Sequence, residues 1–173
     1  NRRLTIDGVL SAFAPAGLTS YTIPNSVTEI GATSFYNCSN LTNVNIPNSV
    51  TKIGVSAFYD CDGLTNITIP DSVTEISSSA FYHCENLTSV TIGNGVTKIG
   101  SRAFYRCIRV TNVTIGNSVA SIGEWAFRNC ESLTSVTIPD SVTKIGSYAF
   151  QACSNLINVT VGNAVTEIAE SAF

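Results

Sequence analysis

Charged residues are scarce in this sequence, and neither sign dominates. Only 12% of the 173 residues are Asp, Glu, Lys or Arg, and the formal net charge is −3. Proteins that bind nucleic acid or an anionic membrane surface generally carry a one-sided positive charge. The composition therefore predicts that the partner is neither a nucleic acid nor a membrane surface.

Long apolar runs are also missing, although 44% of the residues are hydrophobic, enough for one folded domain with its own core. No stretch approaches the roughly 18 apolar residues of a transmembrane helix, so we expect no direct insertion into a membrane. The opening NRRLTIDGVL has no apolar run of signal-peptide length. A signal removed earlier stays an open alternative.

Residues typical of catalytic and cofactor sites are rare. The sequence has one histidine, His83, no C-x-x-C motif, and glycines that are spread along the chain instead of clustered in a phosphate-binding loop. A catalytic triad would need a nucleophile beside the histidine. We therefore predict no enzyme activity, no cofactor and no bound metal.

What the sequence does contain is an internal repeat with a constant step of 23 residues, which is typical of solenoid proteins. Isoleucine and valine keep this step through most of the chain, so the register does not slip. The repeat is clearest for cysteine, at 38, 61, 84, 107, 130 and 153, and for phenylalanine, at 35, 58, 81, 104, 127, 150 and 173.

Each copy contains the signals of one coil. Residues 41–46 (LTNVNI) alternate as a strand with one apolar face, and the following turn leads to a second short extended piece at 50–53. The segment 55–61 (VSAFYDC) is too short for an independent helix, and its apolar spacing predicts one helical or 3₁₀ turn with an inward face.

A single coil cannot cover its own apolar face, so the coils are expected to stack with parallel strands about 4.8 Å apart. Identical residues then form ladders. One surface column alternates in charge wherever two charged residues are adjacent, which avoids repulsion between neighbouring coils and indicates a role in stability. Its members are Glu29, Lys52, Glu75, Lys98, Ser121, Lys144 and Glu167.

The phrase IPNSVTKIGVSAFYDCDGLTNITIP (46–70) resembles the BspA-like, or Treponema pallidum type, leucine-rich repeat. The resemblance covers residues 18–173. Residues 1–17 resemble the degenerate N-terminal capping coil of such arrays, with Ala12 and Pro15 where Phe and Cys would stand.

The resemblance implies an α/β solenoid: a right-handed leucine-rich-repeat stack of about seven coils, with a parallel β-sheet on the concave face and short helical or 3₁₀ turns opposite. It also implies a secreted or cell-surface protein of a bacterium or protozoan, in a family associated with adhesion to host proteins and other cells. It brings no catalytic residues.

The six cysteines allow three interpretations. Stacked Cα atoms at about 4.8 Å fall inside the window for a disulfide, but side chains that point in parallel keep their Cβ atoms farther apart than a disulfide favours. Zinc needs four converging ligands, whereas a straight column offers at most two adjacent sulfurs. We therefore favour six reduced, buried thiols that act as small core residues.

The only histidine lies in a mixed surface column. His83 shares this column with Asp60 and Arg106, which allows an Asp–His contact between neighbouring coils. Cys84 is next in sequence and is expected to face the core, while Tyr82 is expected to face solvent. We predict no catalytic role for this group.

Two surfaces are candidates for partner binding. The first is the outward side of the strands, which is polar and uncharged and would hydrogen-bond a glycan or an extended peptide; simple solvation of exposed strands is the alternative. A role in ice binding ranks lower, because the rows are not Thr-x-Thr. The central residues are Asn66, Thr68, Ser89, Thr91, Asn112 and Thr114.

The second surface combines three arginines with the only tryptophan. Arg102 and Arg106 are expected on one side of the short helical turn, near Arg109, and Trp125 would stack on Arg102 from the next coil. Arginine and tryptophan are frequent hot-spot residues. The alternative is drift in a tolerant surface column, with Glu124 and Glu131 neutralising the charge.

The sequence thus predicts a non-enzymatic, protein- or glycan-binding module of a secreted or cell-surface protein, with a host matrix protein, a cell-surface protein or a glycan as partner. Two alternatives stay open. The array would be a structural stalk if it bound nothing, or an ancillary domain if a secreted enzyme lay beside it. The sequence leaves the oligomeric state open.

Overall fold

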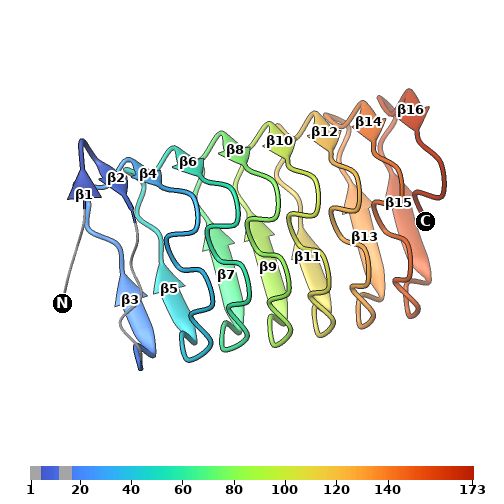
Figure 1. Cartoon of the computed structure of the whole chain (residues 1–173). Coiled ribbons are helices and arrows are strands. Elements are labelled where there is room, and N and C mark those ends of the chain that lie inside the picture. The colour runs from blue at the N-terminus through green and yellow to red at the C-terminus, as the bar shows by residue number, and fades with distance from the viewer. Residues whose placement is uncertain (1–4, 12–16) are drawn as a thin grey trace.

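The computed structural model describes residues 5–11 and 17–173, and in them the chain winds as a right-handed parallel β-solenoid of about seven coils (Figure 1). Two rows of strands run along the stack, one of two-residue strands and one of longer strands. The prediction that the coils stack with parallel strands is confirmed.

The row of short strands is a nine-stranded sheet in the order β1-β2-β4-β6-β8-β10-β12-β14-β16. Only the first pair, β1 and β2, is antiparallel; β2 and each later strand pair in parallel. The strands are β1 (Thr5–Ile6), β2 (Val9–Leu10), β4 (Glu29–Ile30), β6 (Lys52–Ile53), β8 (Glu75–Ile76), β10 (Lys98–Ile99), β12 (Ser121–Ile122), β14 (Lys144–Ile145) and β16 (Glu167–Ile168).

The second row contains the strands predicted at positions such as 41–46. It is divided into three sheets, β3-β5, β7-β9-β11 and β13-β15, all parallel. The strands are β3 (Ser20–Thr22), β5 (Asn43–Asn45), β7 (Asn66–Ile69), β9 (Ser89–Ile92), β11 (Asn112–Thr114), β13 (Ser135–Ile138) and β15 (Asn158–Val161).

The register follows the repeat, so each residue pairs with the residue 23 positions along the chain. Ile99 pairs with Ile122, for example, and Val90 with Val113. The alternating surface column therefore forms ion pairs between coils, with 3.4 Å between Lys52 Nζ and Glu29 Oε1. The equivalent pairs Lys98–Glu75 and Lys144–Glu167 also form, which confirms the predicted charge pattern.

The prediction of helical or 3₁₀ turns is wrong. No helix forms in residues 5–11 or 17–173; turns occupy these segments instead. Two residues in each segment, such as Ser56 (φ 53°) and Asp60 (φ 55°), have left-handed backbone that no right-handed helix can contain. The Phe58 and Asp60 amides then donate to carbonyls of the next coil, at 2.7 and 2.9 Å, whereas the Tyr59 amide between them donates to Ser56 within the same turn.

The core is a set of ladders of identical side chains. Phe81 and Phe104 are fully buried, and their rings stack with centroids 5.1 Å apart and planes 1° apart. All six cysteines are free; five are buried and Cys38 is half-buried. The thiol of Cys84 donates to the Phe58 carbonyl oxygen at 3.2 Å, and Cys61, Cys107, Cys130 and Cys153 make the same bond one coil apart.

At the N-terminal end, β2 continues the short-strand sheet, with Leu10 paired to Ile30. Ala12 and Pro15, the two positions that mark the predicted capping coil, lie outside the described residues. The division into a cap at 1–17 and an array at 18–173 therefore stays a prediction.

Candidate binding surfaces

The strand face, defined as the outward side of β5, β7, β9, β11, β13 and β15, is polar as predicted. Asn66, Thr68, Thr91, Asn112 and Thr114 are exposed there, and Ser89 is half-buried. The Ser89 hydroxyl donates to Asn66 Oδ1 at 2.7 Å, which ties neighbouring coils together across this face.

Two breaks in the ladder of longer strands coincide with a proline that is followed by aspartate. The Gly93 amide donates to the Ile69 carbonyl oxygen at 2.9 Å. Pro70 and Pro139 stand at the equivalent position of their own coils and have no N–H to donate. The sheet is interrupted before each of these two coils, between β5 and β7 and between β11 and β13.

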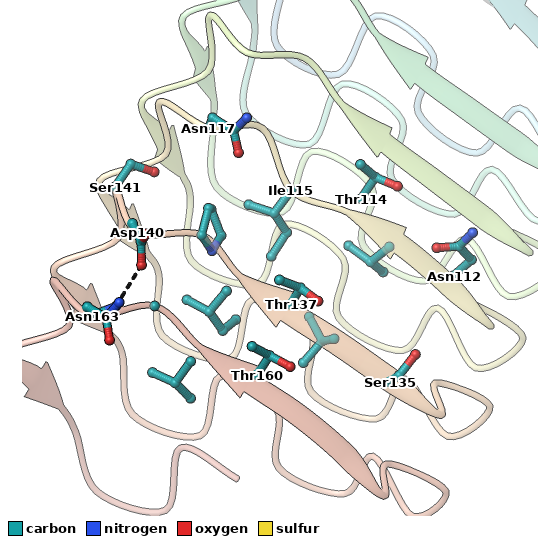
Figure 2. A pocket seen from close by; sticks show the side chains of 16 residues that line it. Asn112, Thr114, Ile115, Asn117, Ser135, Thr137, Asp140, Ser141, Thr160 and Asn163 are labelled. Carbon is teal, nitrogen blue, oxygen red and sulfur yellow. Dashed lines mark hydrogen bonds between the residues drawn. The ribbon is translucent and has the colours of Figure 1, made fainter.

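A groove lies at each break. Groove A, of about 580 Å³, runs across β5, β7 and β9; groove B, of about 890 Å³, runs across β11, β13 and β15 (Figure 2). Both volumes fall within the range typical of ligand pockets. Of the predicted strand-face residues, Asn66, Thr68 and Thr91 line groove A and Asn112 and Thr114 line groove B, whereas Ser89 lines neither.

One carboxylate stands in each groove. In groove A, Asp71 Oδ1 accepts a hydrogen bond from the backbone amide of Asn94 at 2.6 Å. In groove B, Asp140 Oδ1 accepts one from the backbone amide of Asn163 at 2.7 Å. These bonds fix the orientation of each carboxylate. No Lys or Arg is among the residues that line either groove, all of which belong to the described part of the chain.

Sequence reasoning missed these grooves, although a signal was present. The dipeptide Pro-Asp occurs at 70–71 and at 139–140 and nowhere else in the chain. Each occurrence coincides with a break in the row of longer strands. Proline alone does not cause the break, since Pro47 stands at the equivalent position and β3 still pairs with β5.

The arginine surface differs in detail from its prediction. Arg102 lies over the Trp125 ring, with Cζ 3.9 Å from the ring centroid, so the expected stacking is present. Arg106 and Arg109 instead reach the preceding coil, where Arg106 pairs with Glu85 at 3.5 Å and Arg109 donates to Asn86 Oδ1 at 2.9 Å. The three arginines therefore do not gather around the tryptophan, and Arg102 and Arg106 share no helical turn.

The tryptophan has two further neighbours that the sequence did not indicate. Tyr148 lies in the next coil, with ring centroids 6.1 Å apart, and the guanidinium of Arg128 is 5.8 Å from the Trp125 ring. Arg102, Trp125 and Tyr148 all have φ near +58°, where bulky side chains are uncommon. Four other coils place Thr33, Ser56, Ser79 and Ser171 at this position.

The contact predicted for His83 is present. Its Nδ1 lies 3.0 Å from Asp60 Oδ1, and its Nε2 lies 3.1 Å from Glu85 Oε1. Since a carboxylate contacts each ring nitrogen, neither nitrogen faces a nucleophile, and the Cys84 thiol is buried in the core. Within residues 5–11 and 17–173, no three His, Cys, Asp or Glu side chains are placed to hold a metal ion.

Comparison with known families and structures gives a consistent result. A family model described as the BspA type leucine-rich repeat region matches six copies over residues 10–130 and 74–173. None of the functionally curated proteins that were compared matches the chain. Among the described residues there is no helix that would cross a membrane.

Solved structures of bacterial proteins resemble the chain over most of its length. A leucine-rich cell-surface protein of Faecalibacterium prausnitzii is 46% identical over 86% of this chain, with a TM-score of 0.76. The leucine-rich repeat protein of T. pallidum is 32% identical over 88% of this chain, with a TM-score of 0.84. The chain spans 40% of the first structure and 73% of the second.

Proposed function

Because this chain belongs to the family of BspA-type leucine-rich repeats, we propose that it is a non-enzymatic binding module of a secreted or cell-surface protein, with a protein or a glycan as partner. The F. prausnitzii relative is a leucine-rich cell-surface protein, which supports this location. The repeat family supports an interaction role, because solenoid proteins use their extended concave surfaces for binding. In this proposal the strand face is the concave side of the solenoid and carries the binding site.

The observation that carries this proposal is the pair of grooves on the strand face. They are concave, they are lined by outward hydroxyl and amide groups over an apolar floor, and they occur where the sheet is interrupted. Sites for small molecules and peptides commonly combine an apolar surface with a few fixed polar groups. A stalk that only separates two other domains has no need of such grooves.

Two observations support the absence of catalysis. The only histidine is held between two carboxylates, and burial raises the pKa of Cys84 well above its ordinary value, which keeps this thiol protonated and unreactive. The two relatives described above are a leucine-rich cell-surface protein and a leucine-rich repeat protein, and neither is named as an enzyme.

The cluster of Arg102, Trp125, Arg128 and Tyr148 favours a second binding surface, for a protein partner. Large side chains occupy strained backbone positions here in consecutive coils, and strain of this kind often accompanies function. Trp, Tyr and Arg are also the residues that most often dominate binding energy at protein interfaces.

The test is binding of the purified chain to an array of extracellular-matrix proteins and glycans at physiological salt. Thr91→Lys places a long cation in groove A, and the double variant Arg102→Ala with Trp125→Ala removes the stacked pair. Thr74→Lys, beside the short strand β8, is the matched control for an added lysine. A specific hit that is lost in one of the first two variants and kept in the control supports the module and identifies its surface.

If the unmodified chain bound no protein and no glycan of the array, the proposal would be contradicted. It would favour the two alternatives, a structural spacer or an ancillary domain of a larger secreted enzyme.

A further inference from the structure

We propose that grooves A and B are two equivalent subsites for one extended polypeptide segment, which runs along the solenoid and places a cationic side chain in each groove. This inference rests on the proposed binding function of the strand face. It goes further by naming the class of partner and the spacing that the partner needs.

The equivalence of the grooves is visible in their residues. Each residue that lines groove A has a counterpart 69 positions along the chain, three repeats of 23, that lines groove B. The counterparts are chemically identical except that Asn45 corresponds to Thr114 and Asn66 to Ser135. Pro70 and Asp71 thus correspond to Pro139 and Asp140, so the same break and the same carboxylate occur twice.

The charge of the grooves selects a cation. Each aspartate uses Oδ1 for a backbone amide, but an ionised carboxylate has about four acceptor sites, so it keeps capacity for an ammonium or guanidinium group. The outward columns of the strand face contain only Asn, Ser and Thr between the grooves: Asn66, Ser89, Asn112, Thr68, Thr91 and Thr114. No positive side chain in these columns opposes the incoming cation.

The backbone chemistry favours a polypeptide over a sugar chain. Pro70 cannot give Ile46 the ladder bond that Gly93 gives Ile69, and Pro139 cannot give it to Ile115. Ile46 and Ile115 are among the residues that line the grooves, so a peptide that crosses the strands brings its N–H donors past these two backbone acceptors one at a time, without adding a strand to the sheet. Lysine and arginine side chains supply the cations, whereas the charged groups of most sugars are anionic.

The spacing of the grooves sets the spacing of the cations. Three coils at about 4.8 Å separate Asp71 from Asp140 by roughly 14 Å along the stack. An extended peptide rises about 3.4 Å per residue, so four residues span nearly the same distance. Side chains four residues apart also point to the same face of an extended peptide. A partner with Lys or Arg at positions i and i+4 therefore matches both grooves.

The test uses three synthetic peptides capped at both ends, measured by NMR titration and calorimetry at about 0.15 M salt. GSKSTSKSG has lysines four positions apart, GSKSKSTSG has the same composition with lysines two apart, and GSQSTSQSG is neutral. The protein variants are Asp71→Asn, Asp140→Asn and the double variant. Glu131→Gln, on the turn side, is the control for loss of one exposed carboxylate, and unchanged thermal unfolding shows that every variant is folded.

We expect the four-apart peptide to bind about two- to fivefold more tightly than the two-apart peptide, which is the gain of one exposed ion pair. Each single Asn variant should abolish this preference, and the double variant should bind the lysine peptides no better than the neutral peptide.

Equal affinity for the two lysine spacings, or affinities that Asp71→Asn and Asp140→Asn leave unchanged, would overturn the inference. A glycan hit in the array that either Asp variant removes would overturn the choice of a polypeptide while the binding module stands. Absence of both peptide binding and any array hit would overturn the inference and the proposed function together.

Discussion

The buried cysteine ladder makes the stability of this protein fall at alkaline pH. Burial raises the pKa of the Cys107 thiol from an ordinary value of 9.0 to about 12. Between these two values the folded chain keeps the proton and the unfolded chain loses it, so the free energy of unfolding falls as pH rises. Below pH 9 this thiol is protonated in both states and its contribution is constant.

The size of the effect follows from the difference in pKa. Each pH unit above 9 costs about 1.4 kcal/mol, so Cys107 alone removes about 2 kcal/mol at pH 10.5 and about 4 kcal/mol by pH 12. A domain is typically stable by roughly 5–15 kcal/mol, so the loss is large enough to measure. Burial also raises the pKa values of Cys84 and Cys130 well above their ordinary value, and these thiols add to the slope.

The assay is urea unfolding at pH 7.5 and pH 10.5 in the presence of a reductant, followed by the fluorescence of Trp125, for the unmodified chain and for Cys107→Ala. The alanine variant loses packing equally at both pH values, but it lacks the titrating thiol. We therefore expect its loss of stability between the two pH values to be about 2 kcal/mol smaller.

Cys38→Ala is the matched control. This thiol is half-buried, and the neighbouring Cys61 side chain lowers its pKa, so its removal should not reduce the alkaline loss of stability. If Cys107→Ala and the unmodified chain lost the same stability between pH 7.5 and pH 10.5, water would have to reach the cysteine column, and the reasoning would be refuted.

Three further predictions concern packing and surface charge. Phe104→Ala should lower the free energy of unfolding by about 3–5 kcal/mol in urea titrations, because the ring is fully buried in its ladder, whereas Phe173→Ala should cost clearly less because that ring is 48% exposed. Gly116→Ala should destabilise by about 1–3 kcal/mol, seen as a lower Tm, since its Cβ would clash with the Gly93 carbonyl oxygen of the preceding coil. Lys98→Met should change stability by less than about 1 kcal/mol, and less again at high salt, because the Lys98–Glu75 pair is exposed; a larger change in denaturation midpoint would contradict this.

The turns show where sequence reasoning ended. The apolar spacing of Ala57, Phe58 and Cys61 indicates which side chains face inward, and all three are buried. It does not reveal the backbone conformation, because a helical turn and the observed turns bury the same side chains. The choice is made by hydrogen bonds to the next coil, such as the Phe58 amide to the Ala80 carbonyl, which exist only once coils stack.

The candidate sites show the same division. The stacking of Arg102 on Trp125 was predictable because residues 23 positions apart must be neighbours in this stack. The partners of Arg106 and Arg109 were not predictable, since long flexible side chains choose among several neighbours according to local geometry.

The sequence by itself determined the number of coils, their register and the identity of every ladder. A strict period of 23 residues allows only one register in which identical apolar side chains of successive coils stack in the core. Tertiary structure decided which backbone conformation closes each coil and where the strand ladder opens. The reason is that both depend on hydrogen bonds between coils: left-handed residues direct amides to the next coil, and the strand pairing is interrupted between β5 and β7 and between β11 and β13.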